Sequence, residues 1–131
     1  MNTAATRPFG RDTALRIARA FLPKHPLGNR WDYYYTLAKL RSDPLYPGVL
    51  QALRGSDAPV LDLGCGLGLL AHALRADDQH MAYRGVDNDA AKITRATKVA
   101  AKNALVDVHF DLVDLADGPP PHQGSVAILD V

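Results

Sequence analysis

A short apolar run that ends in three alternating glycines constrains this 131-residue chain more than any other feature. Residues 60–68 read VLDLGCGLG, with an aspartate just before the glycines. A buried strand that turns at Gly-x-Gly-x-Gly into a helix is typical of the first unit of a doubly wound sheet. Glycines there allow positive φ angles and let a ligand lie against the main chain, which a Cβ would block. The segment therefore predicts an α/β fold with a ligand site at this turn.

The rest of the chain divides at about residue 55. Residues 1–55 predict a helical N-terminal extension, and residues 56–131 predict a Rossmann-like domain in which strands alternate with helices. Such alternation implies a parallel sheet with right-handed crossovers. The expected helices of the extension cover residues 13–22, 30–41 and 45–53. The expected strands cover residues 59–63, 82–87, 106–110 and 126–129, and the helices between them cover 67–76 and 89–103.

Composition and charge narrow the class of protein. Hydrophobic residues make up 47% of the chain and charged residues 22%, which is ordinary for a globular protein and argues against disorder. No apolar run approaches the roughly 18 residues of a membrane helix. A single cysteine, Cys65, fits a reducing compartment, so we expect a cytoplasmic protein. Residues 1–41 carry a net charge of +6 and residues 42–131 carry −5, so the two parts differ electrostatically.

The spacing of the glycines separates two classes of ligand. A dinucleotide-binding turn needs a glycine at the sixth position, where this chain has Leu69, and Gly68 comes one place earlier. Residues 60–68 instead resemble motif I of the class I S-adenosylmethionine (SAM)-dependent methyltransferases throughout their length. The resemblance continues in three further motifs and covers about residues 58–131. It implies a parallel sheet with strand order 3-2-1-4, followed in the family by three more strands that would lie beyond Val131.

The resemblance also implies a set of cofactor contacts. Asp87 lies nineteen residues after Gly68, near the separation at which such sheets present an acid to ribose. Asp62 and Gly64 match contacts of the methionine amino group, and Asp111 and Leu112 match contacts of adenine. The full predicted set is Asp62, Gly64, Cys65, Gly66, Gly68, Asp87, Asn88, Asp111, Leu112 and Asp130.

Several of these residues also have a purely structural interpretation. Asp87 or Asp89 can cap the helix that follows, and Asp89 is the better candidate for that role. We expect Asp114 to cap a turn, Cys65 to be a small residue that the turn requires, and His72 to be a surface or packing residue. The histidines show no metal-ligand spacing, so we predict no metal site.

Charge favours SAM independently of the motifs. SAM carries a sulfonium, an ammonium and a carboxylate but no phosphate. The predicted rim is acidic and its glycine turn has no lysine or arginine, which attracts a cation and repels a pyrophosphate. No Gly-Lys-Ser/Thr sequence supports nucleoside triphosphate chemistry.

We therefore predict the cofactor-binding part of a SAM-dependent methyltransferase that acts on a small-molecule or carrier-bound acceptor. Two alternatives stay open: a non-catalytic SAM-binding or interaction module, and an NAD-dependent oxidoreductase. No catalytic base is assigned. In this family the acceptor side is built from segments beyond strand four and from N-terminal helices, so we expect the 131-residue chain alone to be weakly active or inactive.

The N-terminal extension combines aromatic and cationic residues. We expect it either to cover the cofactor as a lid, with Arg30, Lys39 and Arg41 attracting an anionic acceptor, or simply to pack its aromatic residues on the sheet. The pI of about 7.9 argues against nucleic acid as a partner. The last strand has no lysine or proline that would protect its edge, so we also expect self-association through residues 126–129.

Overall fold

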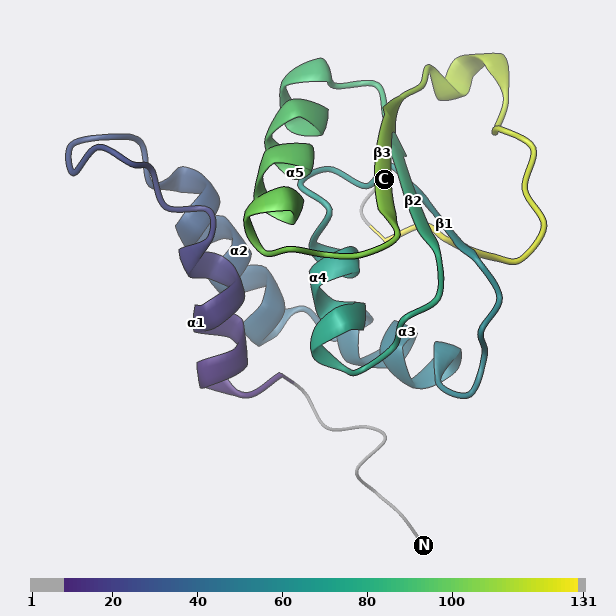
Figure 1. Cartoon of the computed structure of the whole chain (residues 1–131), viewed down its shortest axis with the longest axis horizontal. Helices are drawn as coiled ribbons and strands as arrows, with labels where there is room; N and C mark the ends of the chain where they lie inside the picture. Colours follow the sequence, from purple (N-terminus) through teal and green to yellow (C-terminus); the bar gives the residue numbers. More distant parts are fainter. Residues whose placement is uncertain (1–8, 130–131) are drawn as a thin grey trace, which may run out of the picture. The chain divides into compact units, whose positions relative to one another are not determined.

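A computed structural model describes residues 9–129 of the chain, and these divide into two compact units between Leu53 and Arg54 (Figure 1). The first unit is helical. Its three helices are α1 (Arg11–Arg19), α2 (Trp31–Ser42) and α3 (Leu45–Leu53). No helix within the described residues is long and apolar enough to cross a membrane.

The second unit is a four-stranded parallel sheet with strand order β3-β2-β1-β4, which confirms the predicted order. Its strands are β1 (Val60–Leu63), β2 (Tyr83–Asp87), β3 (Val108–Leu112) and β4 (Ser125–Ala127). The connecting elements are α4 (Leu69–Ala76), α5 (Ala90–Lys102) and the short 3-10 helix η2 (Leu115–Asp117). Helices α4 and α5 lie along the same side of the sheet (Figure 1), as expected for successive right-handed crossovers in one direction.

Local sequence explains why the two crossover helices begin where they do. Helix α4 starts after Gly68, and its first six residues are all buried, which its leucine- and alanine-rich sequence allows. Helix α5 starts after Asp89, whose carboxylate accepts from the backbone N–H groups of Ala91 and Lys92. The predicted capping role of Asp89 is therefore confirmed. A carboxylate at this position satisfies N–H groups that have no partner within the helix.

Strands β1 and β2 begin one residue later than predicted, and the other two strands differ from their predicted bounds by up to two residues. Strand β3 begins and ends two residues later than expected, because the residues before it are held in a turn. The guanidinium of Arg75 donates to the carbonyl of Val106 at 3.0 Å, and Asp107 has a φ of 59°. Strand β4 begins at Ser125 and ends at Ala127, since Ser125 N donates to the carbonyl of Pro59 at the start of its pairing with β1.

Candidate functional site

The turn between β1 and α4 has the left-handed backbone that its glycines predict. The φ angles of Gly64, Gly66 and Gly68 are 70°, 55° and 76°. The N–H groups of Gly64 and Cys65 both donate to the carbonyl of Val86 on β2, at 2.9 and 3.0 Å. These bonds fasten the first half of the turn to the neighbouring strand. The turn is therefore a fixed part of the sheet edge.

The glycines of this region serve different purposes. A Cβ on Gly66 would meet nothing within 4 Å, so the space beside it is open to a ligand. A Cβ on Gly68 would lie 2.5 Å from the ring of Phe110. A Cβ on Gly85 would lie 2.9 Å from both Phe110 and the Sγ of Cys65. Phe110 thus fills the space beside Gly68 and Gly85, and of these three glycines Gly66 is the one with open space beside it.

The carboxylate of Asp87 joins the end of β2 to the glycine turn. Its Oδ2 accepts from Gly66 N at 2.9 Å, and its Oδ1 accepts from Asp89 N at 2.9 Å. Each oxygen of a carboxylate can accept more than one hydrogen bond, so both retain capacity for ligand hydroxyls. The neighbouring Asn88 is exposed. The structure therefore brings together the two motifs that the sequence placed nineteen residues apart.

Asp62 is buried beneath the same turn, with only 2% of its surface exposed. The hydroxyl of Tyr83 donates to its Oδ2 at 2.6 Å. Burial raises the pKa of Asp62 to about 7, the hydrogen bond from Tyr83 lowers it, and the nearby charge of Asp87 raises it. Burial and the same two carboxylates also raise the pKa of the Cys65 thiol. Cys65 is therefore a packing residue rather than a nucleophile.

The end of β3 supplies the third side of the site. Asp111 lies inside the strand and pairs with Arg84 across the sheet, with Nε and Oδ2 2.7 Å apart. Leu112 is 58% exposed and lies opposite Asp87 in the register. Because side chains alternate along a strand, Asp111 lies on the face of the sheet opposite to that of Asp87 and Leu112. Asp111 therefore lies within β3 and not just after its end, as the predicted bounds had it.

Asp114 comes after that strand and has the capping role expected of it. Its Oδ1 accepts from Ala116 N at 2.9 Å, at the start of η2. The preceding residue, Val113, donates its N–H to the carbonyl of Asp87 at 2.9 Å, so the chain stays attached to β2 up to this point. Asp114 is therefore the first acid beyond the carboxyl end of β3.

Two further predictions concern residues away from the turn. Asp130 lies outside the described residues. His72, on α4, is 2% exposed, and its Nδ1 lies 3.3 Å from the side-chain amide of Asn103. Burial lowers its pKa to about 4. Of the two expected roles, packing rather than exposure on the surface is the one that the structure supports.

Sequence reasoning missed Tyr83 and Phe110. Their rings meet edge to face, with centroids 5.7 Å apart. A signal for Tyr83 was present, since a tyrosine in a buried strand needs a partner for its hydroxyl, and Asp62 lies on the adjacent strand. Phe110 could not be assigned in this way, because its contact with Gly68 depends on the register of β3.

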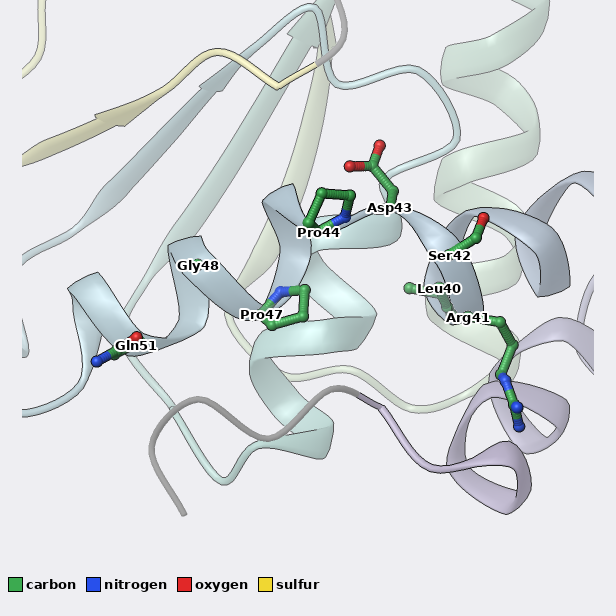
Figure 2. A pocket seen from close by; sticks show the side chains of 8 residues that line it. All are labelled: Leu40, Arg41, Ser42, Asp43, Pro44, Pro47, Gly48 and Gln51. Carbon is green, nitrogen blue, oxygen red and sulfur yellow. The ribbon is translucent and has the colours of Figure 1, made fainter. Parts of the chain in front are cut away.

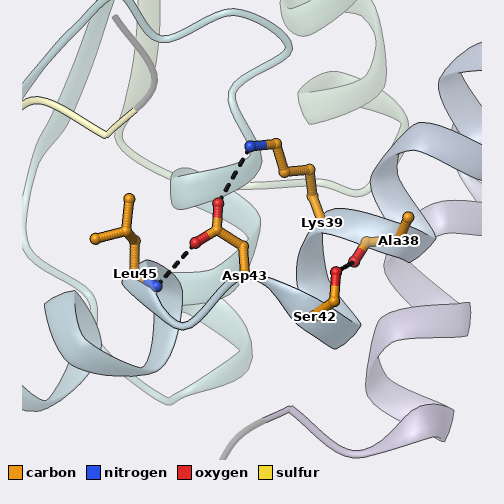
Figure 3. Close-up of polar contacts among 5 residues, drawn as sticks. All are labelled: Ala38, Lys39, Ser42, Asp43 and Leu45. Carbon is orange, nitrogen blue, oxygen red and sulfur yellow. Dashed lines mark hydrogen bonds and ion pairs between the residues drawn. The ribbon is translucent and has the colours of Figure 1, made fainter.

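The helical unit has an open groove of about 440 Å³ where α2 meets α3 (Figure 2). Its lining residues are Leu40, Arg41, Ser42, Asp43, Pro44, Pro47, Gly48 and Gln51. Asp43 pairs with Lys39 at 3.1 Å and accepts from Leu45 N at 2.9 Å (Figure 3). These bonds lower the pKa of Asp43, the one from Leu45 most strongly.

The three cationic residues expected to attract an acceptor differ in their contacts. Lys39 pairs with Asp43, and Nη2 of Arg30 donates to the carbonyl of Pro26 at 3.3 Å. Arg41 is exposed and lines the groove. Of the three, Arg41 is therefore the one that belongs to the lining of the groove.

The family is decided by comparison with known proteins. The family model described as a methyltransferase domain matches residues 54–125, which is more than half of the chain. The chain belongs to this family. The family that residues 60–68 predicted is thereby confirmed. Comparison with curated proteins finds no matching sequence.

Solved structures share the fold at low sequence identity. An RNA methyltransferase from Salinibacter ruber, in complex with S-adenosyl-L-homocysteine, has a TM-score of 0.54 and 23% identity over 66% of this chain and 57% of its own. Coclaurine N-methyltransferase, bound to N-methylheliamine and SAH, has a TM-score of 0.54 and 16% identity over 86% of this chain and 34% of its own. The chain thus spans from about a third to just over half of these methyltransferases, and the likeness confirms the Rossmann-like sheet.

Proposed function

We propose that the chain binds SAM at the carboxyl edge of β1, β2 and β3 and forms the cofactor-binding part of a SAM-dependent methyltransferase. One observation carries the proposal: two carboxylates, Asp62 and Asp87, lie at a glycine turn whose Gly66 faces open space. Within residues 9–129, neither carboxylate pairs with a lysine or arginine. This arrangement suits a cationic ligand without phosphates.

Each part of SAM has a fitting group at this edge. The two oxygens of Asp87 can accept from the ribose hydroxyls while they hold the turn. Asp62 provides a carboxylate for the ammonium group. The open space beside Gly66 allows a ligand to approach the main chain closely. A dinucleotide would instead bring its pyrophosphate against two carboxylates, which is unfavourable. The NAD alternative is therefore disfavoured.

Methyl transfer from SAM depends on the alignment of the cofactor with the acceptor more than on acid–base groups. When bound, SAM supplies a methyl group that is already activated for transfer. The role of this chain is to hold the cofactor in a fixed orientation, which the bonds from Gly66 to Asp87 and from Cys65 to Val86 favour. We assign no catalytic base and no catalytic residue.

For the adenine contact, the sequence predicted Asp111 and Leu112, and this remains a prediction. The position of Leu112 opposite Asp87 supports its part in the contact. For the acid, we favour Asp114, because Asp111 lies on the other face of the sheet and pairs with Arg84. Asp114 lies beyond the strand end, on the same edge as Asp87 and the glycine turn.

Calorimetry with SAM, S-adenosylhomocysteine and NAD tests the proposal directly. We expect the first two to bind and NAD not to bind. Asp87→Ala should weaken SAM binding by about 1.5–3 kcal/mol, the typical loss of hydrogen bonds to a charged group. Asp89→Ala is the matched control, since it removes the helix cap at the same strand end and leaves the Asp87 carboxylate in place. Unchanged SAM affinity in Asp87→Ala would reject the ribose assignment.

We also propose that the acceptor is anionic and that the groove of the helical unit receives it. Arg41 provides the charge, and Pro44 and Pro47 provide apolar surface beside it. Octanoate and phenyl phosphate are suitable probes, with binding followed by NMR shifts. Arg41→Gln should abolish the shifts at the groove, whereas Arg30→Gln should not. Equal binding by Arg41→Gln and the unchanged protein would remove the groove from the acceptor path.

Self-association through β4 is a further proposal. Val126 is 55% exposed and Ile128 is 61% exposed, and β4 pairs with β1 on one side of the described sheet. An unprotected apolar edge strand favours pairing with another chain. Light scattering at high protein concentration should detect dimers that Val126→Lys prevents. A monomer at every concentration would contradict this proposal.

A non-catalytic SAM-binding module remains the alternative. Labelled SAM with candidate acceptors separates the two hypotheses: transfer of the methyl group supports the enzyme, and binding without transfer supports the module.

A further inference from the structure

A hydrogen bond joins Tyr83 to Asp62 and is separate from the bonds that hold the glycine turn in place. The tyrosine lies on β2 and the aspartate on β1, and both are almost fully buried, at 1% and 2% exposure. The oxygens are 2.6 Å apart, which is the distance of a hydroxyl bonded to a charged carboxylate. The hydrogen bond therefore affects the charge of the Asp62 carboxylate as well as the packing of the two strands.

Packing holds the tyrosine in the orientation that makes the bond. Its ring meets the ring of Phe110 edge to face at 5.7 Å, and Phe110 in turn fills the space beside Gly68 and Gly85. Tyr83 lies opposite Val60 in the β1–β2 register, two residues before Asp62. The hydroxyl therefore approaches Asp62 along the strand direction from a fixed ring.

The carboxylate has one oxygen bonded to the protein and one without a partner. Oδ2 accepts from Tyr83, and Oδ1 has no hydrogen-bond donor among residues 9–129. The titratable groups that act on or respond to Asp62 are Tyr83 and Asp87 from β2 and Cys65 from the turn. None of them is a cation, so a ligand ammonium would supply the missing positive charge.

We propose that Tyr83 is a positioning residue that turns Oδ2 of Asp62 toward β2, leaves Oδ1 for the ammonium of SAM, and thereby sets the pH range over which SAM binds. This inference rests on the proposed function, because it assumes that SAM occupies the turn. Burial opposes the ionised form of Asp62, and the Tyr83 hydroxyl favours it. Without the hydroxyl, the carboxylate would take up a proton at a higher pH and lose its attraction for a cation.

The test measures the affinity of the full chain for S-adenosylhomocysteine, which carries the same ammonium, between about pH 5.5 and pH 9. In the unchanged protein the affinity should fall as the pH drops below about 7, by up to about tenfold per pH unit. In Tyr83→Phe we expect the midpoint of this fall to lie about one pH unit higher. Tyr46→Phe, which removes another buried hydroxyl from the helical unit, is the matched control and should leave the midpoint unchanged.

A merely structural role for Tyr83 would weaken binding by the same factor at every pH, and that result would overturn the inference. NMR titration of the Asp62 carboxyl carbon in the ligand-free chain provides a measurement that does not need SAM. It should show the same upward shift in Tyr83→Phe, and no shift would also overturn the inference. If the carboxyl shift appears but neither SAM nor S-adenosylhomocysteine binds at any pH, the proposed function has failed, and with it the link to SAM.

Discussion

The two sides of the candidate site are built in different ways. On the side of the glycine turn, Asp62 accepts a hydrogen bond from Tyr83 and is almost fully buried. Asp87 accepts hydrogen bonds from the backbone N–H groups of Gly66 and Asp89. On the side of β3, Leu112 and Asp114 are exposed. The carboxylates of the first side accept hydrogen bonds from other segments of the fold, whereas the Asp114 carboxylate caps its own turn through Ala116 N. Substitutions on the two sides should therefore differ in their effect on stability.

The largest expected difference comes from Asp62→Asn. The pKa of about 7 in the folded chain exceeds the ordinary value of 3.8, so the folded chain binds the extra proton between these pH values and loses stability as the pH rises through them. At about pH 8, Asp62→Asn should therefore be more stable than the unchanged protein, by up to about 4 kcal/mol. Below about pH 4 the two should be alike.

Urea unfolding across this pH range checks the prediction. Asp111→Asn is the control from the exposed side and should show no such gain. If Asp62→Asn and the unchanged protein were equally stable at high pH, burial of the charged Asp62 carboxylate would not destabilise the fold as expected.

His72, which is buried on α4 away from the glycine turn, should have the opposite pH dependence. Its pKa of about 4 in the folded chain lies below the ordinary value of 6.5, so its contribution to stability is present above pH 6.5 and is lost as the pH falls to about 4. The size of this loss is up to about 3 kcal/mol. It opposes the effect of Asp62, so the unchanged protein should show little net change over this range.

The double variant Asp62→Asn/His72→Gln separates the two contributions. Asp62→Asn alone should lose stability on acidification, and the double variant should not. Thermal unfolding at several pH values measures both, and an equal loss in the two variants would assign the acid sensitivity to another group.

Gly68→Ala and Gly66→Ala compare two glycines of one turn. Both have positive φ, which costs an alanine roughly 1–2 kcal/mol. Only Gly68 would also bring a methyl group against Phe110, where overpacking adds about 1 kcal/mol or more. Gly68→Ala should therefore lose about 2–3 kcal/mol of stability and Gly66→Ala about 1–2 kcal/mol.

Binding should show the reverse order for these two variants. The methyl group of Gly66→Ala enters the open space where we place the ligand. Relative to its loss of stability, this variant should therefore lose more SAM affinity than Gly68→Ala. Chemical unfolding and calorimetry on the same preparations provide both values. Equal losses of stability would show that Phe110 moves aside.

The smallest effects are expected on the β3 side. The Arg84–Asp111 pair is about half exposed, at 40% and 50%, so breaking it in Asp111→Asn should cost at most about 1 kcal/mol of stability. Its SAM affinity should not change. Asp114→Asn keeps an oxygen for the Ala116 cap, so it should stay folded and lose affinity if it faces adenine. Loss of affinity in Asp111→Asn instead would restore the original adenine assignment.

Much of the second unit could be predicted from sequence because its signals are local. The run of residues 60–68, the acid at the end of β2 and the cap at Asp89 each depend on a few neighbouring residues. The bounds of β3 could not be predicted in this way. The strand starts late because Arg75, more than thirty residues earlier, holds the carbonyl of Val106, and no pattern around Val106 indicates that contact.

Sequence by itself determined the family, the parallel sheet with its strand order, and the glycine turn with Asp62 and Asp87 beside it. The parallel sheet follows from the alternation of strands and helices and the turn from the conformations that glycine adopts easily, whereas the family and the strand order follow from the resemblance of four motifs to those of known methyltransferases. Only the tertiary structure decided that Tyr83 bonds to Asp62, that Phe110 fills the space beside Gly68, and that Asp111 pairs with Arg84. Each of these contacts joins different strands, or a strand and the turn. It therefore depends on the register between segments, and a shift of one residue would turn each side chain to the other face of the sheet.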